Sequence, residues 1–151
     1  MKNFMRVLLA LLLVLAMVLC FAACKDEEKT TPTQATQEDG EIAAQGFWKT
    51  ATYRKDVTVG EGSKTVKIDV EIDGKSITIT LKTNEANLGA ALYEAELTND
   101  SSFFDTLNGI ELDWNTHKAY WAFYEGETYM QIGVADEAIS GGEHYRFVYT
   151  K

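Results

Sequence analysis

The sequence predicts an α+β domain in which one short helix packs across a mixed β-sheet. Three observations support this prediction. Residues 66–82 alternate between apolar and polar side chains on either side of an Asp-Gly pair, residues 88–95 repeat apolar side chains at helical spacing, and four further strand-like segments follow. This order of elements is typical of a sheet that carries its helix on one face.

The most regular part of the sequence is a predicted β-hairpin. Residues 66–73 alternate between aliphatic and charged side chains, as expected for a strand with one buried and one solvated face. Asp73-Gly74 follows, a dipeptide that readily adopts the positive φ angles of a tight turn. Residues 76–82 then alternate on the return strand, and residues 47–59 are predicted to add an edge strand upstream.

A helix and four strands complete the predicted domain. Leu88, Ala91 and Leu92 lie on one face of a helix, and Asn84 or Asn87 precedes them as a candidate N-cap. The later strands are predicted at residues 107–112 around Asn108-Gly109, at 119–124, at 128–134 and at 145–150. Glycines between them supply the turns or bulges that a compact sheet needs.

The first 23 residues have the pattern of a bacterial lipoprotein signal peptide. Lys2 and Arg6 form a positive region, an uncharged apolar run follows, and Ala22-Ala23 place small residues immediately before Cys24. We therefore expect cleavage after Ala23 and acylation of Cys24, which would attach the protein to the membrane through its acyl chains. This predicts a lipid-anchored protein on the extracytoplasmic face of the bacterial cell membrane.

Two alternatives to this signal remain open at the sequence level. Residues 7–23 reach the short limit of a membrane-spanning helix, so an uncleaved anchor is one alternative. A freely secreted chain cut after Ala23 is the other, and it would leave a lone terminal thiol. Cys20 fits acylation less well because Leu19 precedes it, where a small residue is wanted.

Composition divides the remaining chain into a tether and one domain. Residues 24–45 are acidic and rich in Thr, Gln and Ala, a composition that favours a flexible tether. Residues 46–151 are long enough for one modest core. The whole chain has 14 basic and 23 acidic residues and a net charge of -9, which argues against a nucleic-acid partner.

The polar residues show no spacing typical of an enzyme or a metal site. His117 and His144 have no evident partners, and no serine lies in a nucleophile elbow. The segment Asp113-Trp114-Asn115-Thr116-His117 lacks the glycine and the final acid of a calcium loop. Asp69, Glu71 and Asp73 are interpreted as a solvated sheet face. The sequence thus predicts no catalytic residue, no metal ligand and no cofactor.

Five aromatic residues gather within ten positions of the sequence: Tyr120, Trp121, Phe123, Tyr124 and Tyr129. On a strand, Trp121 and Phe123 face one side, while Tyr120 and Tyr124 face the other. One face is expected to build the core. The other is either an exposed platform for a ligand or a protein, or a covered surface whose tyrosine hydroxyls reach solvent.

An ordered set of short motifs, spread over about residues 47–150, resembles the transcobalamin-like C-terminal domain family. The motifs are Ile72-Asp73-Gly74-Lys75, Leu88-Gly89-Ala90-Ala91-Leu92, Asn108-Gly109-Ile110, Tyr120-Trp121-Ala122-Phe123-Tyr124, Gly133-Val134-Ala135-Asp136 and Gly142-Glu143-His144-Tyr145-Arg146-Phe147. The family includes single-domain bacterial lipoproteins and, more remotely, the small C-terminal domain of the animal cobalamin carriers. The resemblance implies a β-grasp-like fold of the soluble-ligand-binding type.

The resemblance also implies a ligand site. In the carriers this domain closes over one face of the corrin ring, and the matching residues here are Tyr120, Trp121, Met130, Gln131 and Ile132. The carriers trap their ligand against a helical barrel that this chain lacks, so a partner or a dimer would have to supply the other wall. The resulting hypothesis is a non-enzymatic binding module for a corrinoid or another small ligand. The alternative is a protein-interaction or surface-assembly module that uses the same aromatic face.

Overall fold

The computed structural model describes residues 40–151. The predicted signal peptide at 1–23, the predicted acylation site Cys24 and most of the predicted tether lie outside the described residues. The last predicted tether residues belong to the packed domain, because Ile42 is only 2% exposed and its N–H donates to the Arg54 carbonyl at 2.6 Å. Within residues 40–151, each helix is too short to cross a membrane.

The predicted β-hairpin is confirmed. Strand β2 (Lys64–Ile72) pairs antiparallel with β3 (Lys75–Thr83), and Ile68 lies opposite Ile79. Asp73 and Gly74 connect the strands with φ angles of 51° and 72°, the positive values of a two-residue turn. The aliphatic side chains of both strands are buried on one face, so the alternation in the sequence identifies the core side of the sheet.

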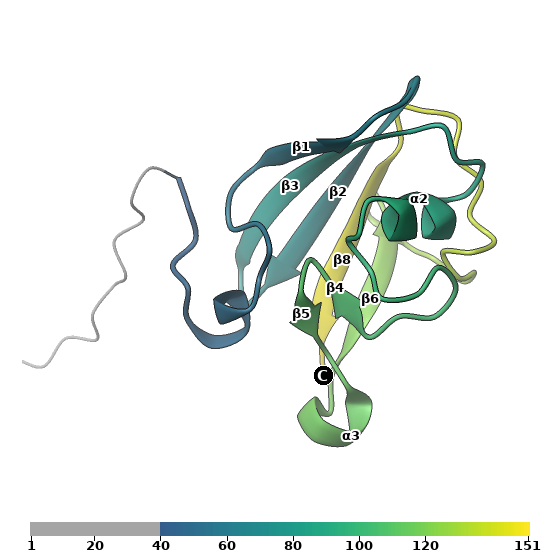
Figure 1. Ribbon diagram of the computed structural model, residues 1–151. Coiled ribbons are helices and arrows are strands. Elements are labelled where there is room, and N and C mark those ends of the chain that lie inside the picture. Colours follow the sequence, from purple (N-terminus) through teal and green to yellow (C-terminus); the bar gives the residue numbers. More distant parts are fainter. Residues whose placement is uncertain (1–39) are drawn as a thin grey trace, which may run out of the picture. The chain divides into compact units, whose positions relative to one another are not determined.

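Four more strands extend this hairpin into a mixed six-stranded sheet (Figure 1). They are β1 (Val57–Gly60), β6 (Tyr120–Glu125), β7 (Thr128–Tyr129) and β8 (His144–Thr150). The strand order is β1-β3-β2-β8-β6-β7, and the β1/β3 and β2/β8 pairs are parallel while the others are antiparallel. The predicted α+β class with a mixed sheet is therefore confirmed.

The core lies on one side of the sheet and is covered by helix α2 (Leu88–Glu94) and by loops (Figure 1). Leu88 and Leu92 are fully buried there. Of the two predicted caps, Asn87 is the N-cap: its side chain accepts a hydrogen bond from the Ala90 N–H at 2.8 Å. Asn84 instead accepts from the Ser63 N–H, so it joins the β2 start to the end of β3.

Two strand predictions were wrong in detail. Residues 107–112 form a small hairpin, β4 (Thr106–Leu107) and β5 (Ile110–Glu111), because Asn108-Gly109 adopts positive φ angles of 53° and 74° and reverses the chain. The strand predicted at 128–134 ends at Tyr129. Beyond it the chain leaves the sheet, and the Val134 carbonyl accepts from Gly89 of α2.

The edge-strand prediction at 47–59 is correct only at its end. Residues Gly46–Lys49 form a 3-10 helix, η2, and the strand β1 begins at Val57. A second short helix, α3 (Trp114–His117), occupies the segment considered as a calcium loop. Asp113 caps it by accepting from the Asn115 and Thr116 N–H groups, so the oxygen-bearing residues there stabilise a helix end.

Candidate functional site

A pocket of about 280 Å³ opens beside β6 and β7. Three segments line it, namely the loop at 102–104, the first half of β6 and the chain at 129–134, with Phe147 of β8 completing the wall. We call it the aromatic pocket. Across residues 40–151, every side chain that contributes to its lining is uncharged, and aromatic rings predominate. Such a lining is typical of sites that bind organic ligands.

Four of the five ligand contacts proposed from the sequence line the aromatic pocket: Tyr120, Trp121, Met130 and Ile132. Gln131 is exposed and is absent from the lining. Tyr120 and Trp121 come from β6, whereas Met130 and Ile132 lie on the irregular chain after β7. The fold thus brings together residues that the sequence places in two separate segments.

The interior end of the pocket is built from core aromatics. Phe123 and Phe147 stack with ring centroids 5.1 Å apart and planes within 10°, and Phe104 lies 5.7 Å from Phe147. The Trp121 indole N–H donates to the Asp105 carbonyl at 3.2 Å, which holds the ring against the loop. The wall formed by these rings is therefore positioned by packing and by a hydrogen bond before any ligand arrives.

The outer rim of the pocket is exposed. Phe103 is 89% exposed, while Tyr129 and Ile132 are each 47% exposed. A tight turn presents Phe103: the Asp100 carboxylate accepts from the Ser102 and Phe103 N–H groups at 2.7 and 3.1 Å. These hydrogen bonds lower the pKa of Asp100, so the carboxylate stays ionised at neutral pH.

The sequence reasoning missed Phe103 and Phe104. Their signal in the sequence is an adjacent aromatic pair within a polar stretch that belongs to no predicted element. Large apolar side chains in such a loop must either pack on the core or be displayed, and here Phe104 does the first and Phe103 the second.

Gly89, at the start of α2, joins two walls of the pocket. Its N–H donates to the Val134 carbonyl at 2.9 Å, and a Cβ at this position would lie 2.0 Å from the Ser101 carbonyl oxygen. Only glycine permits so close an approach of backbone to backbone. The Ser101 carbonyl and the chain at Val134 therefore both lie against the backbone of this one residue.

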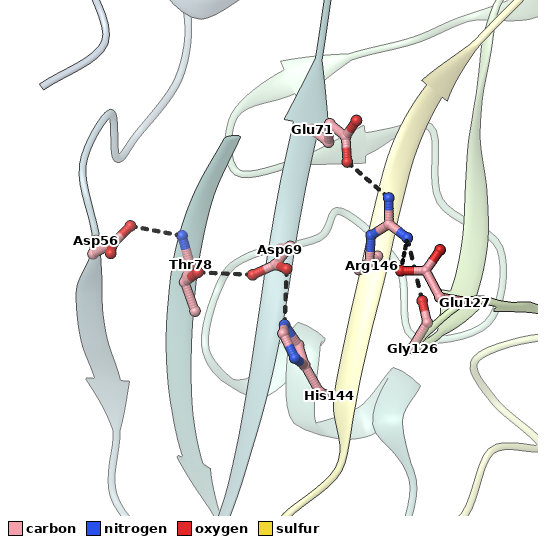
Figure 2. Close-up of polar contacts among 8 residues, drawn as sticks. All are labelled: Asp56, Asp69, Glu71, Thr78, Gly126, Glu127, His144 and Arg146. Carbon is pink, nitrogen blue, oxygen red and sulfur yellow. Dashed lines mark hydrogen bonds and ion pairs between the residues drawn. The ribbon is translucent and has the colours of Figure 1, made fainter. Parts of the chain in front are cut away.

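The opposite face of the sheet is polar and carries an ordered set of hydrogen bonds (Figure 2). One oxygen of the Asp69 carboxylate, Oδ1, accepts a hydrogen bond from the Thr78 hydroxyl. The other oxygen, Oδ2, lies 2.8 Å from Nε2 of His144. Farther along, Arg146 bridges Glu71 at 3.0 Å and Glu127 at 3.1 Å. The sequence assigned no partner to His144, because Asp69 is 75 residues away and becomes a neighbour only when β8 pairs with β2.

This arrangement does not match a nucleophilic triad. A triad places histidine between the carboxylate and the hydroxyl, so that imidazole removes the hydroxyl proton. Here Asp69 lies between Thr78 and His144, and the Thr78 hydroxyl donates to the carboxylate. The part of the chain that the structure covers also contains no group of three or more His, Cys, Asp and Glu residues placed to hold a metal ion.

Two hollows on the polar face meet at Lys67 and have volumes of about 400 and 580 Å³. They are larger than the aromatic pocket. Threonines, serines, charged groups and two glycines make up most of their lining, and neither includes an aromatic ring other than His144. Since ligand pockets usually combine a mainly apolar lining with a few polar groups, the aromatic pocket is the better candidate site.

The described residues thus define an α+β domain with an aromatic pocket at one end of a mixed sheet. No protein-family model and no curated protein matches the chain. A crystal structure from Ruminococcus gnavus ATCC 29149, described as that of a candidate metal-binding protein, superposes with a TM-score of 0.54 at 17% identity. The match covers 59% of this chain and 98% of that one. At this identity the likeness shows the fold alone.

A second solved structure with remote similarity is haptocorrin in complex with Cbi. It has a TM-score of 0.46 and 16% identity, and the match covers 58% of this chain and 25% of the haptocorrin chain. The matched part of this chain therefore spans about a quarter of the length of the haptocorrin chain.

Proposed function

We propose that this protein is a non-enzymatic binding module, tethered to the outer face of the cell membrane, whose aromatic pocket takes a small organic ligand. The observation that carries the proposal is the pocket itself. Four residues selected from the sequence meet there, next to rings that packing already holds in place. Binding to a preformed site avoids part of the ordering cost that weakens flexible sites.

The first candidate ligand is a corrinoid, on the basis of the sequence resemblance described above. The pocket volume of about 280 Å³ lies just below the roughly 300–1,000 Å³ of pockets that hold drug-sized ligands. It would accommodate one edge or one substituent of a large ring. The remainder of such a ligand would extend over the exposed rim, where a partner protein or a second copy would enclose it.

Ligand binding is expected to be saturable and to depend on the rim. We expect calorimetric titration of the full chain in maltoside micelles with cobalamin and smaller ring compounds to identify a binder. Phe103→Ala should then weaken its affinity about two- to tenfold, since aromatic contacts contribute roughly 0.5–1.5 kcal/mol. The melting temperature should stay unchanged, because Phe103 is 89% exposed.

Tyr93→Ala is the matched control for this experiment. Tyr93 is an exposed aromatic residue of α2 that does not line the pocket, so its removal should leave binding unchanged. Equal losses in both variants would place the ligand elsewhere. An absence of heat with every ring compound at millimolar concentration would count against a small-ligand site.

A protein partner is the second candidate function, and the exposed rim favours it. Phe103, Tyr129 and Ile132 present apolar surface to solvent around the pocket. Aromatic residues in exposed apolar patches are frequent anchors of protein interfaces. If the pocket binds a partner protein, Phe103→Ala should abolish association with that partner. Small ring compounds should then bind neither the wild-type protein nor the variant.

Membrane attachment is expected to depend on Cys24. Metabolic labelling with a fatty-acid analogue should mark the wild-type chain and Cys20→Ala equally, whereas Cys24→Ala should be unlabelled. Residues 46–151 contain 10 basic and 17 acidic residues, so the domain is not attracted to anionic lipid. Most of the Cys24→Ala protein should therefore leave the membrane fraction. If the Cys24→Ala protein were still labelled, Cys20 would be the acylated residue instead.

A further inference from the structure

The net charge of the domain comes from the segment that supplies most of the aromatic pocket. Residues 99–137 contain eight acidic residues and one basic residue, Lys118. The rest of the domain, 46–98 together with 138–151, contains nine of each. The entire net charge of the domain thus originates in the segment that supplies every lining residue of the pocket except Phe147.

Four acidic residues flank the lining segments along the chain, and none of them lines the pocket. Asp100 and Asp105 flank the loop that carries Phe103 and Phe104, while Glu125 and Glu127 lie at the β6–β7 turn. Asp105 accepts from Asn99 and Thr106, and Asp100 accepts from two backbone N–H groups. The pocket is therefore an uncharged aromatic cavity built from a segment of net negative charge, which favours cations over anions.

Of the two nearby basic groups, Arg146 pairs with one flanking acid, Glu127, and Lys118 lies against a ring outside the pocket. Lys118 lies with its Nζ 6.0 Å from the centroid of the Trp114 ring, and Trp114 does not line the pocket. Arg146 is held between Glu71 and Glu127 on the polar face. Neither side chain contributes to the lining.

An aromatic lining distinguishes one kind of cation from another. The faces of aromatic rings carry partial negative charge and attract cations, most strongly where water is excluded. A primary ammonium group brings three N–H donors, and each one that is buried without an acceptor costs free energy. The lining provides no carboxylate to accept them. An alkylated nitrogen has no N–H donors and presents an apolar surface, so it fits this lining better.

We infer that the aromatic pocket recognises a ligand group with a quaternary, alkylated ammonium nitrogen. The inference rests on the proposed function, because it specifies the chemistry that the same pocket selects. Aromatic side chains of the lining would contact the cation, and the carboxylates that flank the lining segments would favour its approach from solvent.

Choline and 3,3-dimethyl-1-butanol provide the test, because the two compounds have the same shape. Choline has a positively charged nitrogen where the butanol has a neutral carbon. Met130 is the sole methionine of residues 40–151 and lines the pocket, so its ¹³C-labelled methyl group reports binding by NMR. The full chain in maltoside micelles is titrated with each compound, and the resonance is assigned with Met130→Leu. We expect choline to shift it saturably, with an affinity about threefold or more above that of the neutral compound.

Two variants separate ring electrostatics from simple apolar burial. Tyr129→Leu keeps an apolar side chain but removes the ring, so it should abolish the preference for choline while the neutral compound binds as before. Tyr93→Leu, outside the pocket, should leave the preference intact. Thermal unfolding of both variants verifies that they are folded, which is expected because both tyrosines are about half exposed.

The outcomes distinguish this inference from the proposed function. Equal affinities for choline and the neutral compound, or a preference that survives Tyr129→Leu, would overturn the inference while a small-ligand site remained. If cobalamin shifted the Met130 resonance but neither small compound did, the inference would also be overturned and the small-ligand site would remain. If no compound shifted the Met130 resonance, both proposals would fail.

Discussion

Phe147→Ala is expected to lower the free energy of unfolding by about 3–5 kcal/mol, the usual cost of removing a buried phenylalanine. Phe147 is 1% exposed, lies between Val70 of β2 and Phe123 of β6, and stacks on Phe123 with centroids 5.1 Å apart. Removing its ring leaves a cavity in the middle of the sheet. Urea denaturation monitored by circular dichroism measures the loss.

The neighbouring residue provides a matched control for this substitution. Val148 lies on the opposite face of β8 and is half-buried, so Val148→Ala should cost about 1 kcal/mol or less. If the two substitutions proved equally destabilising, the assignment of the two faces of β8 would be incorrect. Phe147 also closes the aromatic pocket, so any folded Phe147→Ala protein should bind ligand more weakly.

Asn108→Ala is expected to destabilise the domain by about 2–4 kcal/mol, because it leaves buried backbone groups without partners. The Asn108 side chain is fully buried; its Oδ1 accepts from the Tyr53 N–H at 2.9 Å and its Nδ2 donates to the Tyr53 carbonyl at 2.8 Å. These two bonds attach the chain before β1 to the β4–β5 hairpin. A third bond between the same segments, from the Thr52 N–H to the Asn108 carbonyl at 2.8 Å, involves only backbone atoms and is not removed by the substitution.

The backbone conformation of Asn108 contributes separately. Its φ angle of 53° is left-handed, which asparagine and glycine tolerate better than alanine. Asn108→Gly should therefore recover about 1 kcal/mol relative to Asn108→Ala, and the remaining loss measures the two side-chain hydrogen bonds. Chemical denaturation of both variants gives the comparison. A glycine variant as stable as wild type would show that these bonds make no net contribution.

Much of the fold was predictable because its signals are local. The β2–β3 hairpin needs only an alternating pattern and the Asp73-Gly74 turn, all within about 20 residues. The α2 cap at Asn87 is also local, since its side chain bonds to an N–H three residues away. Alternation also placed Phe123 of β6 in the core, although Ala122 on the other predicted face is buried as well. Short-range periodicity and turn chemistry carry this information.

The predictions that failed concern segments whose partners are distant. Residues 130–134 have the composition of a strand, yet the Val134 carbonyl bonds to the N–H of Gly89, and the chain follows α2 instead of the sheet. Asn108-Gly109 has a turn signature, but its role as a buried anchor for Tyr53 depends on a residue 55 positions away. Propensity alone does not determine which partner satisfies a backbone group.

The candidate site shows the same division. Tyr120, Trp121, Met130 and Ile132 were selected from sequence motifs, and they meet in one pocket. Phe103 and Phe104 escaped selection, because their loop is joined to the pocket through Trp121 and Gly89, which are distant in sequence. The His144–Asp69 pair escaped for the same reason.

By itself, the sequence determined the α+β class, the hairpin, the helix with two candidate caps, the apolar face of each long strand and the acidic charge of the domain. These properties depend on neighbouring residues and on composition. Only the tertiary structure decided that β8 pairs with β2, that the loop at 102–104 lies against β6, and that eleven residues of one acidic segment and Phe147 form a single aromatic pocket. The physical reason is that long-range contacts depend on how the whole chain buries its apolar surface at once.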